Sequence, residues 1–264
     1  MPSYGPVPLK HAAICIGVVA VVVGGFLLVE IATTVAPSTG PALPALDGVA
    51  IVGHTWDTGT GPTIIASTPL PHYFEGWILA FVSYVNPSSP PAVVDVTGTV
   101  GGNYSLQYST GLGGYSTEAL YAATGVDTLA TEVSVSATFS GDSVPPGATL
   151  AIVLVSTAIQ GAASYVYTYG GVQSGSGGNA TVGFATDPGG VAVLGVAGPE
   201  TDAPFNSAAG ETLLDTGHGT TGPGGVGVSF GTLAALASGA HVQLSAFPNA
   251  PGPWNAIGIE LVLL

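Results

Sequence analysis

The chain has 264 residues, of which only 6% are charged, and its single basic residue, Lys10, faces 15 acidic ones, for a formal net charge of −14. One basic residue cannot neutralise a nucleic-acid backbone or hold a phosphoryl group, which argues against binding of nucleic acid or nucleotides. A single cysteine, Cys15, excludes an internal disulfide and argues against a cysteine-based zinc site.

The first predicted element is a transmembrane helix. Residues 12–29 carry no charged side chain, and as an α-helix they would span roughly 27 Å, close to the thickness of a bilayer core. We therefore expect residues 1–11 to form a short cytoplasmic tail and residues 12–35 to form a signal anchor. Because Lys10 precedes this run, the positive-inside rule places the carboxy-terminal bulk outside the cell membrane, which the chain crosses once.

Two other interpretations of this terminus stay open. A signal peptide cut after Ala36 is possible, although the apolar run is long for a cleaved signal and Pro37 follows the cut. The short tail, the lysine, the long apolar helix and a β-rich body also resemble the layout of type IV pilin precursors, which are cleaved before the helix. The glutamate that is usual early in the pilin helix is missing here.

Residues 36–46 are rich in proline and predict an extended linker. Residues 47–264 predict one extracytoplasmic all-β domain, because short runs of Val, Ile, Thr, Tyr and Phe alternate with Gly, Pro, Asn and Ser clusters. The expected strands are 49–52, 63–67, 77–85, 93–99, 105–108, 118–123, 132–139, 149–157, 165–172, 180–184, 191–197, 226–230, 241–247 and 255–263.

The strand pattern contains a hint of internal duplication. Residues 77–84 are echoed by 191–198, residues 133–139 by 242–247, and residues 151–157 by 256–262. Two similar series of antiparallel strands favour a jelly-roll-like β-sandwich made of two Greek keys. Residues 253–261, 189–198 and 77–84 also resemble segments of secreted jelly-roll modules of surface and extracellular proteins. That resemblance implies a β-sandwich in an extracytoplasmic setting and no particular activity.

Three motifs carry candidate chemistry. Asp-Thr-Gly occurs at Asp57 and again at Asp215, and pepsin-like aspartic proteases use two such triplets so that two carboxylates share a proton. The segments that follow the two triplets differ too much in length for two matching lobes, so glycine turns are the simpler interpretation. Tyr165, Tyr167 and Tyr169 share one face of an expected strand and would stack on sugar rings if exposed, or pack in the core if buried. Asn103 and Asn179 begin N-glycosylation sequons.

No metal site and no cofactor is expected, because the histidines and carboxylates show no metal-ligand spacing. We expect a membrane-anchored surface protein with a structural or adhesive role. In one version of this hypothesis the protein self-associates into filaments. A polysaccharide-binding module that uses the tyrosine row and an acid protease are the alternatives. Every acidic residue except Glu30 lies in the β-rich part, which has no basic partner. This composition favours a protein that functions in an acidic environment, where the carboxylates lose their charge.

Overall fold

In the computed structural model the described residues are 49–59, 61–71, 74–85, 93–112, 116–127, 130–141, 145, 147–157, 165–199, 205–219, 228–237, 239, 241–248 and 252–263. Contacts divide the chain into the units Met1–Thr39 and Gly40–Leu264, and all described residues belong to the second. The predicted tail, transmembrane helix and linker lie outside the described residues. Within the described part, no helix is long and apolar enough to cross a membrane.

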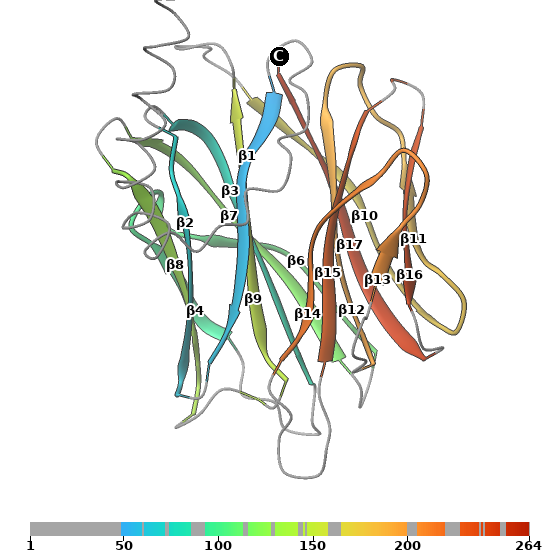
Figure 1. Cartoon of the computed structure of the whole chain (residues 1–264), viewed down its shortest axis with the longest axis horizontal. Helices are drawn as coiled ribbons and strands as arrows, with labels where there is room; N and C mark the ends of the chain where they lie inside the picture. Colours follow the sequence, from blue (N-terminus) through green and yellow to red (C-terminus); the bar gives the residue numbers. More distant parts are fainter. Residues whose placement is uncertain are drawn as a thin grey trace, which may run out of the picture. The chain divides into compact units, whose positions relative to one another are not determined.

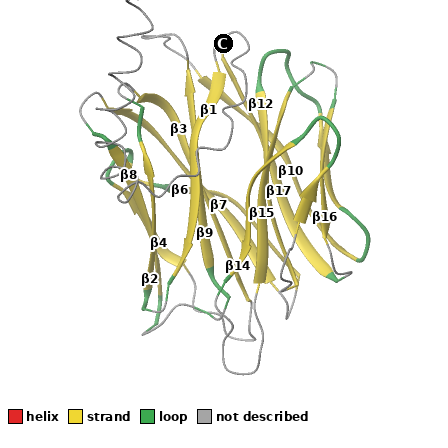
Figure 2. Ribbon diagram, viewed as in Figure 1, coloured by secondary structure: helices red, strands yellow, loops and turns green. Residues whose placement is uncertain are grey.

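The described residues form strands and no helix, as Figure 2 shows, which confirms the all-β prediction. We call residues 49–157 the first half. Its strands are β1 (Val49–Thr58), β2 (Thr63–Pro69), β3 (Phe74–Val85), β4 (Val93–Gly98), β5 (Gly102–Asn103), β6 (Ser105–Leu112), β7 (Ser116–Asp127), β8 (Glu132–Phe139) and β9 (Thr149–Thr157).

Residues 165–263 are the second half. Its strands are β10 (Tyr165–Ser176), β11 (Ala180–Phe184), β12 (Val191–Pro199), β13 (Phe205–Ser207), β14 (Thr212–His218), β15 (Val228–Leu236), β16 (Val242–Pro248) and β17 (Pro253–Leu263). In Figure 1 the blue-to-yellow-green strands of the first half lie beside the yellow-to-red strands of the second.

Each half contains two antiparallel sheets. In the first half, sheet A has the strand order β1-β9-β3-β7-β6 and sheet B the order β2-β8-β4-β5. In the second half, sheet C has the order β10-β17-β12-β15-β14 and sheet D the order β11-β16-β13. If β10 is matched to β1, β14 to β6 and the other strands in sequence, sheet C repeats sheet A strand for strand. Sheet D then repeats sheet B without a counterpart of β5.

The repeat is therefore larger than the sequence analysis predicted. The pairs of segments recognised there are β3 with β12, β8 with β16 and β9 with β17, and these pairs are equivalent in the two halves. The sequence pattern predicts one sandwich made from both copies, whereas each copy has two sheets of its own. The alternation of apolar residues records that a strand has a buried face, but it does not record which sheet covers that face.

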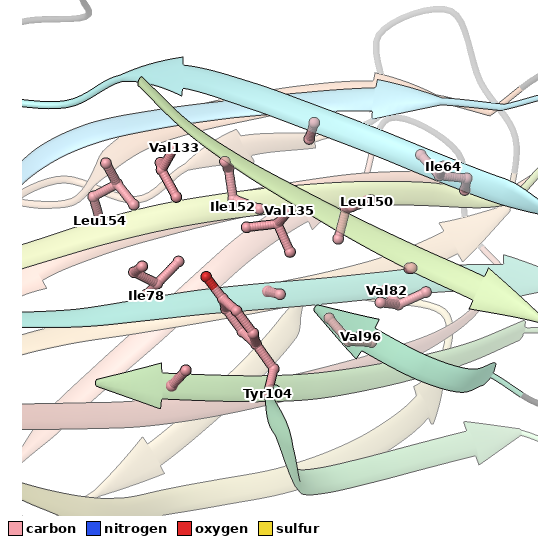
Figure 3. Close-up of a cluster of buried hydrophobic side chains, with 14 of the residues drawn as sticks. Ile64, Ile78, Val82, Val96, Tyr104, Val133, Val135, Leu150, Ile152 and Leu154 are labelled. Carbon is pink, nitrogen blue, oxygen red and sulfur yellow. The ribbon is translucent and has the colours of Figure 1, made fainter. Parts of the chain in front are cut away.

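Three large apolar clusters lie between the four sheets. One fills the space between sheets A and B, and Figure 3 shows the Tyr104 side chain of this cluster pointing toward Ile78, Val135 and Ile152. The Tyr104 hydroxyl donates a hydrogen bond to the Val100 carbonyl at 3.0 Å. A second cluster lies between sheets C and D. The third joins sheets A and C, with Leu79 and Val153 on one side and Val193 and Ile257 on the other.

Sheets A and C are thus covered on both faces. In β9 the even residues 150, 152 and 154 face sheet B, while the odd residues 151, 153 and 155 face sheet C. This accounts for the uninterrupted apolar runs of β9, β12 and β17.

The predicted strands are confirmed in position, with differences at their ends. β8, β9 and β11 have the predicted bounds, whereas β1 continues from Val52 to Thr58 and β15 continues to Leu236. The sequence analysis did not predict β5, β13 or β14. Register shifts interrupt β1 between Ile51 and Gly53 and β14 between Leu213 and Asp215, and a bulge breaks the period of two on which strand prediction depends.

Candidate functional site

The surface where sheets A and C meet, which we call the inter-sheet interface, holds the polar groups of greatest chemical interest. At its centre the Phe81 ring of β3 packs directly against the backbone of Gly195 in β12. The contact is so close that a Cβ atom at Gly195 would overlap the ring. The same Cβ would come within 2.8 Å of Oε1 of Glu118, which places this carboxyl group at the contact between the halves. Glycine at position 195 therefore allows the two sheets to approach closely.

Glu118 is a buried acid without a cation. Its side chain is 1% exposed, and Oε2 accepts a hydrogen bond from the Ser83 hydroxyl on the adjacent strand. Burial raises the pKa of Glu118 to about 8, against the smaller lowering effect of the Ser83 hydrogen bond. The chain's only Lys or Arg is Lys10, so the described residues hold neither for this carboxyl group, which stays protonated at neutral pH.

A row of polar residues crosses sheet A through Glu118. Direct cross-strand neighbours on β1, β9, β3, β7 and β6 are Thr58, Thr149, Ser83, Glu118 and Thr110. The Thr149 hydroxyl is buried and has no hydrogen-bond partner within the described part of the chain. Such a row interrupts the apolar interface and fixes the register in which the two sheets can meet.

Asn255 in β17 connects the halves through hydrogen bonds and is fully buried. Its Nδ2 donates to the carbonyl oxygen and to the hydroxyl of Ser116 in β7, at 2.8 and 2.7 Å. Its Oδ1 accepts from the Ser174 hydroxyl at 2.7 Å. The Ser174 oxygen also lies 2.8 Å from the Thr110 hydroxyl of β6, so the network continues to an exposed edge of the interface.

A second polar link lies at the opposite edge of the interface. Nδ1 of His54 in β1 lies 3.0 Å from Oδ2 of Asp215 in β14, and the two side chains are 10% and 7% exposed. It is the only ion pair given among the described residues, and it carries a formal charge pair only when His54 is protonated. Because 161 positions separate the two residues in the chain, sequence reasoning did not bring them together.

The structure does not pair the two Asp-Thr-Gly aspartates. Asp57 is exposed and accepts a hydrogen bond from the backbone N–H of Thr58 at 2.7 Å. Asp57 lies three positions after His54 on β1 without an intervening bulge, so it points to the opposite face of sheet A from the His54–Asp215 pair. Both aspartates lie on strands rather than in glycine turns. This placement gives no support to a shared-proton protease site.

The other predicted site residues have separate positions. Tyr165, Tyr167 and Tyr169 pair with Leu263, Leu261 and Ile259 of β17, but their side chains lie outside the described part, so the sugar-binding interpretation stays a prediction. Asn103 on β5 and Asn179 before β11 are both exposed, as an acceptor for a glycan must be. Within the described ranges no group of three or more His, Cys, Asp or Glu side chains could hold a metal ion.

Two further carboxyl groups were not identified from the sequence: Glu260, which is buried, and Glu211, which is half-buried. Glu260 in β17 accepts a hydrogen bond from the Asp187 N–H at 2.8 Å, while its Oε2 has no partner among the described residues. Glu211 accepts from the N–H groups of Ala208 and Ser245. Burial raises the pKa of both acids. Glu260 lies within the apolar run Ile257–Leu263 of β17, and that local contrast was the available signal for it.

In comparisons with known proteins, no family model, no curated protein and no solved structure matches the chain. The arrangement must therefore be interpreted from its own chemistry. The described polar groups of the interface are satisfied mainly by one another across two halves of the chain. This is an arrangement that holds two sandwiches in one register.

Proposed function

We propose that the chain is a membrane-anchored extracytoplasmic surface protein with a structural or adhesive role, able to assemble into filaments. The observation that carries this proposal is the inter-sheet interface, which joins two sandwiches into a block whose two middle sheets are covered on both faces. A block of this kind resists local opening, because its central strands can separate only if two apolar clusters are exposed together.

The finer fold assignment belongs to the same proposal. In each half the chain alternates between two sheets: β1, β3, β7 and β9 lie in sheet A, while β2, β4 and β8 lie in sheet B. Repeated crossing from one sheet to the other is typical of a jelly roll. The proposed body is therefore a tandem of two jelly-roll-like sandwiches behind a transmembrane helix at residues 12–35.

The outer face of sheet B supports a role outside the cell in acid. Its strands are linked by hydroxyl pairs in place of ion pairs: Thr63 with Thr138 at 3.2 Å, Ser67 with Ser134 at 2.7 Å, and Thr97 with Ser136 at 3.0 Å. Hydroxyl groups do not titrate in acid, so these links persist where ion pairs of carboxylates would be lost.

Surface location is tested on intact cells that produce the full chain. We expect an antibody against the β-rich body to label unpermeabilised cells, and an added protease to remove that label. Deleting residues 12–35 should abolish membrane attachment. Recovery of the wild-type chain in the soluble cytosolic fraction would contradict the proposal. Negative-stain microscopy of the detached surface layer then distinguishes filaments from single molecules.

A further inference from the structure

The contacts between the two halves follow an approximate twofold pattern. Strand β7 of the first half contacts β12 and β17, and its equivalent β15 contacts β3 and β9, which are the equivalents of β12 and β17. The edge strands behave in the same way, because β6 contacts β10 and its equivalent β14 contacts β1. Strand β3 contacts its own equivalent, β12. The contacts of β6 with β17 and of β1 with β12 and β17 have no equivalent of this strength among the described residues, so the pattern is partial. Reciprocal contacts of this kind are typical of an isologous interface, which joins two copies of one protein.

The specific links of the interface follow the same pattern. The β6–β10 edge carries the Thr110–Ser174 hydrogen bond, and the β14–β1 edge carries the Asp215–His54 pair. Between the edges, Phe81 and Gly195 make the close contact of the equivalent strands β3 and β12. The interface therefore has a close contact at its centre and one polar link at each edge, a hydroxyl pair at one and a His–Asp pair at the other.

Each half is also complete without the other. The cluster between sheets A and B contains residues 64–154 only, and the cluster between sheets C and D contains residues 180–256 only. The chain passes once from one half to the other, between Thr157 and Tyr165. Separating the halves would therefore expose the inter-sheet interface but leave both sandwich cores closed.

We propose that the inter-sheet interface is a self-recognition surface: it pairs the first half of one chain with the second half of another, as well as the two halves of one chain. The partner that it fits is a second copy of this chain. This inference deepens the assembly role proposed above, and chains that exchange halves in this way would form closed dimers or open filaments.

The first test asks whether the interface holds without the covalent connection. A site for a sequence-specific protease is placed between Gly161 and Ala162 of the full chain, which is purified in detergent, folded and then cut. We expect the second half to stay bound to the tagged first half. Gly195→Val should lower this retention at least tenfold, whereas Gly61→Val should leave it unchanged, because a Cβ at Gly61 meets no atom within 4 Å. Release of the wild-type second half on cutting would overturn the proposal.

The second test asks for pairing between chains. One full chain carries Gly195→Val, which damages only its second-half face, and the other carries Leu79→Asp, which damages only its first-half face. Produced together, they retain one intact face of each kind, and we expect them to co-purify in a 1:1 complex. Two differently tagged copies of the same variant, which together lack one kind of intact face, should not co-purify. Absence of the complex, with strand content retained by circular dichroism, would overturn pairing between chains.

Neither test depends on cell-surface location or on filaments, so failure here is distinguishable from failure of the proposed function.

Discussion

At the scale of single residues, the inter-sheet interface depends on polar groups that are buried in a chain almost without cations. Glu118 has one hydrogen-bond donor, Ser83, and contacts the packed Phe81–Gly195 pair. An acid in such a place is tolerated in its protonated form, because removing a charge from water without a partner costs far more than burying a neutral carboxyl group. The proton is thus a structural component of the interface.

Replacing Glu118 by Gln should remove a pH dependence. Since burial raises the pKa of Glu118 to about 8 in the folded protein, the wild type holds this proton more tightly when folded. The bound proton contributes fully to the free energy of unfolding below the unfolded pKa of about 4.5. This contribution falls by about 1.4 kcal/mol per pH unit as the pH rises toward 8. Urea unfolding at pH 4, 6 and 8 should show that the free energy of unfolding of E118Q rises relative to that of the wild type at each step in pH.

The control is Glu132→Gln, which changes an exposed carboxyl group on the outer face of β8. Its stability should follow the wild-type profile across the same pH values. If E118Q and the wild type give parallel profiles, Glu118 does not carry the buried proton.

Replacing Asn255 by Ala should destabilise the protein by about 2–3 kcal/mol, because Ser116 and Ser174 would lose their shared partner inside the interface. The free energy of unfolding from urea titration measures this. Asn103→Ala is the matched control on an exposed position, and it should stay within about 0.5 kcal/mol of the wild type. If Asn255→Ala lowers the free energy of unfolding as little as Asn103→Ala, the Asn255 network contributes nothing to stability.

At the scale of elements, glycine has two separate roles in this chain. At Gly195 it allows two sheets to approach, and at Gly177 and Gly178 it allows the turn between β10 and β11, where φ is +73° and +69°. Only the second role requires the left-handed backbone conformation that other residues avoid. The high glycine content therefore reflects packing as well as turns.

Gly178→Ala should cost about 1 kcal/mol, through backbone strain alone, because a Cβ at this position meets no atom within 4 Å. Gly178→Asn should cost less, since asparagine tolerates the left-handed region. Thermal unfolding followed by circular dichroism gives the comparison. Gly61→Ala, at an equally open position without positive φ, should be neutral or slightly stabilising. A loss at Gly61 equal to that at Gly178 would contradict the strain argument.

At the scale of the whole molecule, the charge balance predicts greater stability in acid than in alkali. Burial raises the pKa of Glu118, Glu211 and Glu260, so each stabilises the folded state at low pH and loses that contribution as the pH rises. The remaining carboxylates repel one another at neutral pH, with no Lys or Arg among the described residues to offset them.

The urea midpoint should therefore be higher at pH 4 than at pH 8. Added salt at pH 8 should restore only the part of the lost stability that is due to repulsion between surface carboxylates. Salt screens exposed charges and leaves buried groups nearly unaffected. A midpoint that is higher at pH 8 than at pH 4 would contradict adaptation to acid.

The sequence by itself determined the β character, most strand positions and the existence of a repeat, because all three depend on local alternation and on spacing along the chain. It also determined that 15 acidic residues share a single Lys or Arg, Lys10, so that nearly all of them must do without such a partner. Only the tertiary structure decided what each face meets. A strand such as β9 is apolar on both faces, so its pattern cannot say which face packs within a sandwich and which packs against the other half. For the same reason the His54–Asp215 pair and the Asn255 network, whose members are far apart in sequence, became visible only when the two sandwiches were seen in contact.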